Sequence, residues 1–270
     1  MKYRPMGSLG WKVSALGFGA MRLPTTKELD EETGEEKLRI DQEKAIDMIR
    51  YGIDNGINYI DTAWPYHDGE SEIVVGEALK GGYREKVKLV TKLPTWLVKK
   101  PEDVHEFLEK QLKRLQTDYL DVYLVHSMNK DHFKIVNENK VLKKLEEARE
   151  KGIIKYIGFS FHDEYDVFKE IIDYYNWDIA QIQYNYLDID YQATTKGLKY
   201  AAEKGIAMVI MEPLQGGKLT REFPDVMEIL DNYNYNKTLA YIAFKFLWDK
   251  KEISVVLSGM SEKWMVEENI

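Results

Sequence analysis

The sequence predicts one α/β domain, a parallel (β/α)8 TIM barrel preceded by a short N-terminal hairpin. Eight short runs rich in valine, isoleucine and leucine alternate with segments of helical periodicity along the whole chain. The length of 270 residues suits a single barrel of this kind. Three successive runs also end on a titratable side chain, namely Asp61, Lys92 and His126. Because the carboxyl ends of barrel strands meet at one rim, these side chains are expected to converge there.

The expected elements follow one another regularly after the hairpin of residues 2–13, where Gly7 and Gly10 mark a turn. The predicted strands cover residues 13–18, 57–60, 87–91, 120–125, 156–159, 179–182, 207–211 and 254–257. The predicted helices cover residues 42–55, 71–80, 101–115, 140–151, 164–175, 192–204 and 237–250, and a last helix begins near residue 262. Glycines that follow several helices, and Pro101 at the head of the third, support these boundaries.

Two connections between these elements are long and polar. Residues 25–41 carry many charges, among them Asp30, Glu31 and Glu32, and predict a solvated loop or a small hairpin. A second polar connection precedes the helix of residues 237–250. Neither connection has the composition of a linker between domains, so residues 1–270 are expected to form one domain.

A doubly wound parallel sheet is the alternative fold. Such a sheet typically has a glycine-rich turn that opens a helix directly after the first strand. Residues 15–19 read Ala-Leu-Gly-Phe-Gly, but the following Arg22-Leu23-Pro24 does not begin a helix. The barrel is therefore favoured.

Composition excludes several classes of function. The formal net charge of −8 argues against a nucleic-acid surface and against an anionic membrane as partner. The absence of cysteine excludes disulfides, a thiolate nucleophile and a cysteine-bound metal. No signal-peptide pattern follows Met1, and no apolar run approaches the roughly 20 residues that span a bilayer. We therefore expect a cytoplasmic protein that acts on a small molecule. The sequence does not indicate its oligomeric state.

Asp61, Tyr66, Lys92 and His126 are the predicted catalytic residues. A buried lysine needs a counter-charge, and Asp61 is the expected partner of Lys92. A lysine beside a phenol favours the phenolate, so the pKa of Tyr66 is predicted to fall below about 10. A phenol tuned in this way serves as a general acid or base. His126 is expected to hydrogen-bond a substrate oxygen or to share the proton.

A metal-dependent hydrolase is the alternative chemistry for this rim, with Asp61, His67 and His126 as ligands. Barrel hydrolases usually draw further histidine ligands from the ends of other strands. The corresponding strands end here in Gly19, Ser160 and Gln183. No metal site is therefore predicted.

The sequence resembles the aldo-keto reductase family along its whole length. The resemblance is carried by residues 56–63, which read Gly-Ile-Asn-Tyr-Ile-Asp-Thr-Ala, by Tyr66 and by Gly76-Glu77-Ala78-Leu79. It continues through residues 120–126, 158–160 and 181–185. The family implies a barrel that binds NADP(H) across its rim and reduces an aldehyde or ketone to an alcohol. By this match Tyr66 is the general acid, Lys92 and Asp61 tune it, and His126 orients the carbonyl.

The resemblance also implies a set of cofactor-binding residues. Ser160 and Gln183 match positions that hold the nicotinamide carboxamide, residues 212–217 match a loop across the pyrophosphate, and residues 259–261 match the adenosine end. The full set is Gly19, Met21, Asp61, Ser160, Gln183, Met211, Pro213, Leu214, Gly216, Gly259, Met260, Ser261, Glu268 and Asn269. Met265 stands where many members have the arginine that grips the 2′-phosphate. NADP(H) is expected, and NAD(H) remains an alternative.

Two further expectations follow from the resemblance. The variants Phe161-His162 and residues 211–214 are similar to a bacterial and archaeal subgroup that often carries a cysteine-rich, ferredoxin-like tail with iron–sulfur clusters. The chain ends at Ile270 inside its last expected helix, so the C-terminal end of the barrel is expected to be incomplete, and clusters would require a longer chain. The alternative function is a redox sensor or regulatory subunit that binds the cofactor but turns over little.

Overall fold

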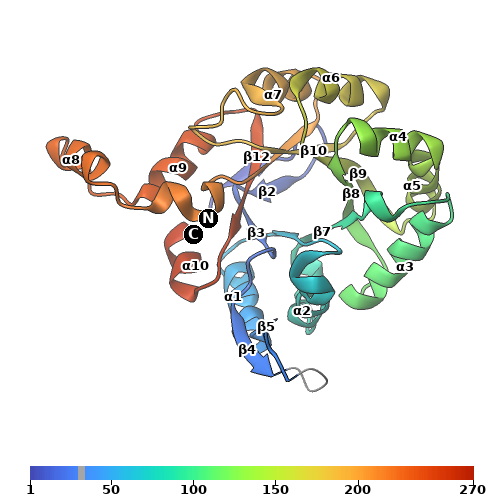
Figure 1. The fold of residues 1–270 in the computed structure, drawn as a ribbon, viewed down its shortest axis with the longest axis horizontal. Coiled ribbons are helices and arrows are strands. Elements are labelled where there is room, and N and C mark those ends of the chain that lie inside the picture. Colours follow the sequence, from blue (N-terminus) through green and yellow to red (C-terminus); the bar gives the residue numbers. More distant parts are fainter. Residues whose placement is uncertain (30–33) are drawn as a thin grey trace.

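The computed structural model describes residues 1–29 and 34–270 and confirms the predicted barrel (Figure 1). Eight strands, all parallel to their neighbours, form a closed ring in which each strand pairs with the next one along the chain. They are β3 (Leu16–Gly19), β6 (Tyr59–Asp61), β7 (Lys88–Leu93), β8 (Leu120–Met128), β9 (Ile154–Phe161), β10 (Ile179–Gln183), β11 (Ala207–Met211) and β12 (Ile253–Gly259).

Helices surround the barrel, and the predicted ones are all present with slightly different ends. They are α1 (Gln42–Asp54), α2 (Glu70–Ala78), α3 (Asp103–Leu115), α5 (Val141–Glu150), α6 (Tyr165–Tyr174), α7 (Thr194–Glu203), α9 (Leu239–Trp248) and α10 (Lys263–Asn269). Two further helices, α4 (Lys130–Glu138) and α8 (Pro224–Asn232), were not predicted. In the described part of the chain, no helix has the length and apolar character needed to cross a bilayer.

The N-terminal hairpin closes one end of the barrel. Its strands, β1 (Tyr3–Pro5) and β2 (Lys12–Ser14), pair in antiparallel fashion. Met6 and Val13 are fully buried in a cluster with residues that start barrel strands, such as Tyr59 and Ile179. The turn fits tightly, because a Cβ on Gly7 would lie 2.7 Å from the backbone nitrogen of Ala207. The opposite end, where the strands finish, is left for the site.

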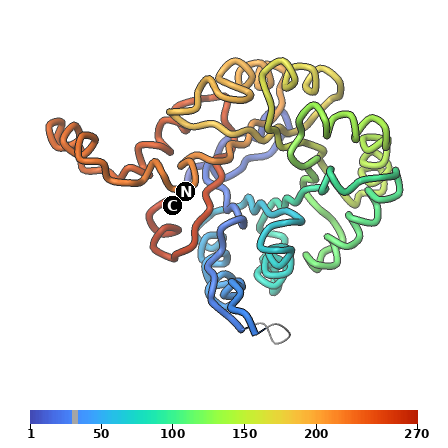
Figure 2. Tube along the Cα trace, in the orientation of Figure 1, coloured from blue at the N-terminus to red at the C-terminus, as the bar shows by residue number. Residues whose placement is uncertain are grey.

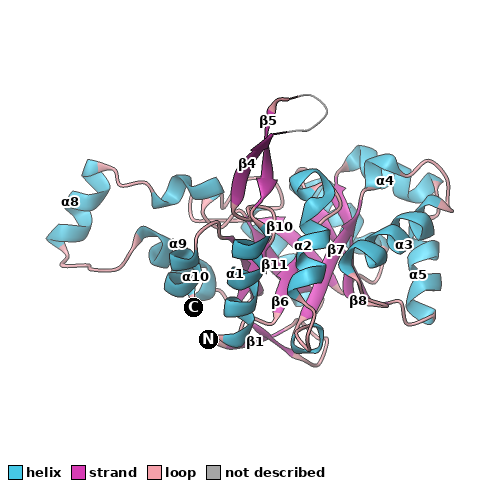
Figure 3. Cartoon of the chain, turned by 90° about the horizontal axis from the view of Figure 1, so that it is seen from below, coloured by secondary structure: helices cyan, strands magenta, loops and turns pink. Residues whose placement is uncertain are grey.

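A second hairpin and α8 both extend beyond the ring of helices. The hairpin is formed by β4 (Thr25–Leu29) and β5 (Glu36–Ile40), which confirms one of the two alternatives predicted for residues 25–41 (Figure 3). The predicted charges at Asp30, Glu31 and Glu32 lie outside the described residues. Helix α8 projects away from the barrel (Figure 2), and none of its residues is buried.

Candidate active site

Three neighbouring barrel strands bring the predicted catalytic residues together. Asp61 ends β6, Lys92 lies near the end of β7, and His126 lies near the end of β8. Tyr66 begins the 3₁₀ turn η1 (Tyr66–Gly69), which connects β6 to α2. All four side chains line one cavity of about 1170 Å³ at the rim where the strands end.

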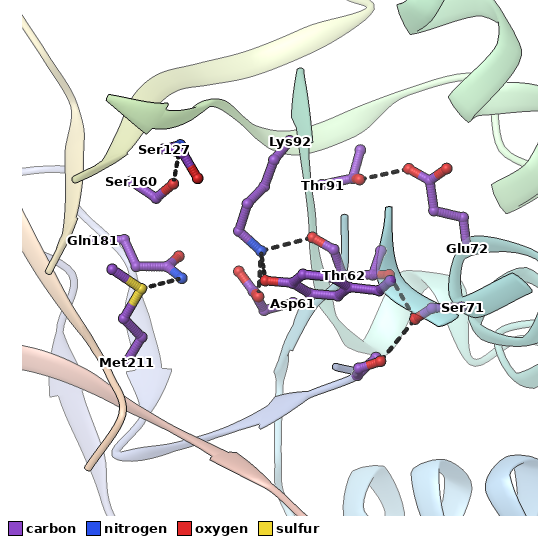
Figure 4. A network of polar contacts seen from close by, with 12 residues as sticks. Asp61, Thr62, Ser71, Glu72, Thr91, Lys92, Ser127, Ser160, Gln181 and Met211 are labelled. Carbon is purple, nitrogen blue, oxygen red and sulfur yellow. Dashed lines mark hydrogen bonds and ion pairs between the residues drawn. The ribbon is translucent and has the colours of Figure 1, made fainter. Parts of the chain in front are cut away.

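The Lys92 ammonium is the centre of this group (Figure 4). Its Nζ lies 2.6 Å from Asp61 Oδ1, 2.8 Å from the carbonyl oxygen of Thr62 and 3.1 Å from Tyr66 Oη. An ammonium has three N–H donors, and each of them has an acceptor here. Because the Tyr66 oxygen accepts this hydrogen bond, its own O–H proton is free to point at a ligand in the cavity.

The buried pair of Asp61 and Lys92 is held as an ion pair. Burial raises the pKa of the Asp61 carboxyl in spite of Lys92. Burial alone would lower the pKa of Lys92, but Asp61 and Tyr66 outweigh it and raise that pKa. The two shifts favour opposite positions for the proton. We place it on Lys92, because only the ammonium can satisfy all three acceptors around Nζ.

The pKa of Tyr66 corrects a prediction from the sequence. Burial raises this pKa above the ordinary value for a phenol, and the opposing effect of Lys92 is not large enough to reverse it. The carboxylates of Asp61 and Glu212 raise it further. The predicted lowering by Lys92 is therefore wrong as a net shift. The phenol stays protonated near neutral pH, as a proton donor must.

His126 is a neutral imidazole held by a distorted strand. Burial, with the nearby charge of Lys92, lowers the pKa of His126 well below its usual value. The next residue, Ser127, has a left-handed φ of 54°, and the pairing of β8 with β9 is irregular there. Ser127 N donates to Ser160 Oγ at 2.8 Å, and Thr95 Oγ1 donates to the carbonyl of His126 at 2.9 Å. These bonds fix the backbone that carries the imidazole.

Most of the predicted cofactor-binding residues line the same cavity as the catalytic group. They are Gly19, Met21, Asp61, Ser160, Met211, Pro213, Leu214, Gly216, Gly259, Ser261, Glu268 and Asn269. Two predicted residues do not line it. Gln183 Nε2 is directed instead toward Asp188 Oδ2 at 3.3 Å, and Met260 is fully buried in the hydrophobic core.

Gln181 stands in the cavity wall in place of Gln183, two residues earlier on β10. Its side chain is only 2% exposed, and its Nε2 lies 3.8 Å from Met211 Sδ (Figure 4). Among the described residues, its Oε1 has no hydrogen-bond partner. The available signal in the sequence was an amide between the apolar Ala180 and Ile182. A buried amide oxygen without a partner, at the wall of a cavity, is a candidate for contact with a ligand.

Arg22 is another cavity residue that the sequence argument missed. It is exposed and stands beside two glycines of the wall. A Cβ on Gly216 would lie 3.3 Å from Arg22 Nη2, and a Cβ on Gly259 would lie 3.3 Å from Arg22 Cβ. The guanidinium can therefore reach an anion that lies between these loops.

The alternative of a metal centre finds no support in the arrangement of the described residues. Residues 1–29 and 34–270 contain no group of three or more His, Asp or Glu side chains placed to hold a metal ion. His67, one of the three candidate ligands, instead accepts a hydrogen bond through Nε2 from the backbone N–H of Leu23 at 3.1 Å.

Comparisons with known proteins agree with this fold. The family profile described as "Aldo/keto reductase family" matches residues 15–270. The NADH-specific methylglyoxal reductase of Escherichia coli is 26% identical, over 100% of this chain and 93% of its own length. The holo form of an aldo-keto reductase from Bacillus halodurans superposes with a TM-score of 0.81 at 27% identity, covering 100% of this chain and 89% of its own.

A third similar structure shares the fold at lower identity. It is an aldo/keto reductase from Klebsiella pneumoniae in complex with NADP and acetate, with a TM-score of 0.77 and 23% identity. The match covers 100% of this chain and 89% of that one.

Proposed function

This chain belongs to the aldo/keto reductase family, and from that premise we propose that it reduces an aldehyde or ketone to an alcohol with NAD(P)H. The observation that carries the proposal is the contact of Lys92 Nζ with Tyr66 Oη at 3.1 Å, backed by Asp61. This contact leaves the proton of the half-buried phenol free to point into the cavity. His126 supplies a second polar group on the neighbouring strand.

The cavity residues fit a nicotinamide cofactor. The unpaired Gln181 Oε1 matches the amide of the nicotinamide carboxamide, with Ser160 on the next strand as a second partner. Arg22, close to Gly216 and Gly259, would meet the diphosphate, and Glu268 with Asn269 would border the adenosine. When bound, the cofactor supplies the hydride that the carbonyl carbon takes up.

The residues of the rim would then complete the reduction by handling one proton. Tyr66 donates its phenolic proton to the carbonyl oxygen, which becomes the hydroxyl of the product. Lys92 stabilises the tyrosinate that remains, because its ammonium already donates to that oxygen. Asp61 keeps the ammonium in place. The neutral His126 is positioned to hydrogen-bond the same carbonyl oxygen, which would fix the orientation of the substrate.

The charges near the adenosine end bear on the choice of cofactor. The cavity wall there consists of Ser261, Trp264, Met265, Glu268 and Asn269, and its one charge among the described residues is the Glu268 carboxylate. The nearby Lys263 does not line the cavity and pairs with Asp47 at 2.9 Å. A carboxylate suits a ribose hydroxyl and repels a phosphate. We therefore propose that NAD(H) binds at least as well as the NADP(H) that the resemblance implies.

The substrate is proposed only as a small carbonyl compound, as family membership implies. A relationship to the subgroup with iron–sulfur tails stays a prediction. This chain has no cysteine, so we propose no cluster for it.

Titration with NADH and NADPH, on wild type and Tyr66→Phe, tests the proposal. Quenching of tryptophan fluorescence reports binding, and loss of cofactor absorbance with a panel of aldehydes reports turnover. We expect both proteins to bind a cofactor and only wild type to turn it over. Binding without turnover by wild type would favour the alternative of a redox sensor, and no binding of either cofactor would contradict the proposal.

A further inference from the structure

The turn that follows Tyr66 has an unusual backbone. His67, Asp68 and Gly69 have φ values of 50°, 54° and 92°, so three consecutive residues lie in the left-handed region. His, Asp and Gly are residue types that tolerate this region best, but a run of three is still unfavourable for a free chain. A strained segment persists only where its surroundings fix it. Contacts from outside the turn must therefore hold the segment that presents Tyr66.

Arg114, on α3, provides such contacts on both sides of Tyr66. Its guanidinium carbon lies 3.7 Å from the centre of the Trp64 ring, which precedes Tyr66 by two residues. The same guanidinium stands against Gly69, where an added Cβ would lie 3.2 Å from Arg114 Nη1. A planar cation stacked on an indole is a favourable contact. Arg114 thus contacts the turn at its entrance and at its exit.

Glu72, on α2, anchors Arg114 from the protein interior. Its carboxylate is completely buried, and its Oε2 accepts from Arg114 Nη1 at 3.1 Å. Its Oε1 accepts from Thr91 Oγ1 at 2.7 Å (Figure 4) and from Gln111 Nε2 at 2.6 Å. A buried carboxylate with one charged partner and two neutral donors is costly to maintain for stability alone.

The same carboxylate is connected to the backbone of Lys92. Gln111 Nε2 lies 3.0 Å from the carbonyl oxygen of Lys92, and the hydroxyl of Tyr123 donates to Gln111 Oε1 at 2.6 Å. Thr91 precedes Lys92 on β7. Glu72 is therefore linked to both partners of the site. Through Arg114 it contacts the turn that carries Tyr66. Through Gln111 and Thr91 it contacts the strand that carries Lys92.

We propose that Glu72 and Arg114 are positioning residues that set the distance between the Tyr66 phenol and the Lys92 ammonium. Neither touches the cavity. The pair acts from the outer side of the barrel wall, between α2 and α3. The kinetic part of this inference rests on the proposed reductase function, whereas the structural part concerns the free chain and does not.

Arg114→Met is the main variant, and because it leaves the buried Glu72 carboxylate without its charged partner, thermal unfolding is measured beside it. Lys113→Met is the matched control, since Lys113 is its exposed neighbour on α3. Amide hydrogen exchange of residues 62–70 is measured in the free proteins. The N–H of Tyr66 donates to the carbonyl of Ala63, so its exchange reports opening of the turn. We expect about tenfold faster exchange in Arg114→Met and no change in Lys113→Met.

Steady-state kinetics give the second readout. We expect kcat to fall about tenfold in Arg114→Met with KM nearly unchanged, because the phenol is misplaced while the cavity wall is intact. Arg114→Lys should recover part of kcat, since it keeps the charge on Glu72 but loses the planar stack on Trp64. Glu72→Gln, if it folds, should act like Arg114→Met.

The inference is overturned if Arg114→Met matches Lys113→Met in the exchange of residues 62–70. It is also overturned if the fall in kcat only matches the loss of folded protein, which thermal unfolding measures alongside. If wild type shows no turnover, the proposed function fails, and the exchange experiment still decides whether Arg114 holds the turn.

Discussion

The two sides of the cavity are built in opposite ways. On the side of β6, β7 and β8, the ammonium of Lys92 has three acceptors, and the turn after Tyr66 is clamped from behind. On the side between β11 and α9, the wall comes from the 3₁₀ segment η4 (Gln215–Thr220), from α8 and from the residues before α9. Helix α8 buries none of its residues.

The residues proposed for proton transfer thus lie on the first side of the cavity, whereas the second side contributes mainly a wall for ligand binding. The groups proposed to handle the proton lie at strand ends or on the turn after β6, where neighbouring residues hold them in place, which is how preorganised sites are stabilised. The opposite wall presents apolar side chains such as Met227 and Leu230 on a projecting element. The following changes test the contrast between the two sides.

Lys92→Met should produce the largest effect, because it removes a donor to Tyr66 and leaves Asp61 buried without its counter-charge. We expect activity to fall by about 10²–10⁴, and stability to fall by about 3–5 kcal/mol. Lys237→Met is the matched control, since Lys237 lines the cavity on the other side but is exposed. Urea unfolding and kcat measure both. Equal losses in the two variants would remove the contrast.

A pH dependence of stability should come from His126 on the rigid side. Burial lowers the pKa of His126 well below its usual value. At mildly acidic pH, His126 is therefore protonated in the unfolded chain but still neutral in the folded chain. The resulting stability is fully present above about pH 6.5 and is lost as the pH falls toward the folded pKa, by up to about 1.4 kcal/mol per unit.

Urea unfolding at a series of pH values between neutral and acidic measures this term in wild type and in His126→Gln. The variant should lose less stability on acidification than wild type. His67 and His162 also have lowered pKa values caused mainly by burial, so some acid sensitivity should remain. An unchanged pH profile in His126→Gln would contradict the assignment.

Met265→Arg sharpens the proposal on the cofactor. A guanidinium beside Glu268 would offer a charged partner to a 2′-phosphate. We expect affinity for NADPH to rise about tenfold, equivalent to about 1.4 kcal/mol, with little change for NADH. Fluorescence titration at low and high salt measures both constants, and the gain should shrink at high salt. An equal gain for NADH would indicate a general effect of charge.

The smallest effect is expected on α8. Ile229 is 58% exposed, so Ile229→Ala should change the free energy of unfolding by less than about 0.5 kcal/mol. Ile171, in α6, is completely buried, and Ile171→Ala should cost about 2–5 kcal/mol. Urea unfolding of the two variants compares them directly. A large loss in Ile229→Ala would mean that α8 packs against something in solution.

Much of the fold, and the convergence of Asp61, Lys92 and His126 at one rim, could be predicted from the sequence. Strand ends are marked by a change from apolar to polar residues, and Asp61, Lys92 and His126 stand at such changes on neighbouring strands. Helix α8 was missed although Val226, Met227 and Leu230 stand at helical spacing, because this short helix lies inside a connection rich in polar residues.

The errors at the site have physical reasons too. Gln181 and Gln183 are two residues apart on β10, so the strand places both on the same face. Only the position of Asp188 in the structure shows that Gln183 is the one directed away from the cavity. Met260 falls between Gly259 and Ser261, where it packs into the core while its neighbours face the cavity. The pKa of Tyr66 was wrongly predicted because the sequence shows the lysine but not the burial.

The N-terminal hairpin has a consequence for the way ligands enter and leave the barrel. Met6 and its neighbours fill the end of the barrel where the strands begin. The cavity therefore opens to solvent at the other end, where the strands finish. The cavity would then have one opening, which the carbonyl substrate, the alcohol product and the nicotinamide coenzyme would all use. The molecule that binds deepest in the cavity would then have to bind first and leave last. An alcohol bound above the coenzyme would then have to leave before the coenzyme is exchanged.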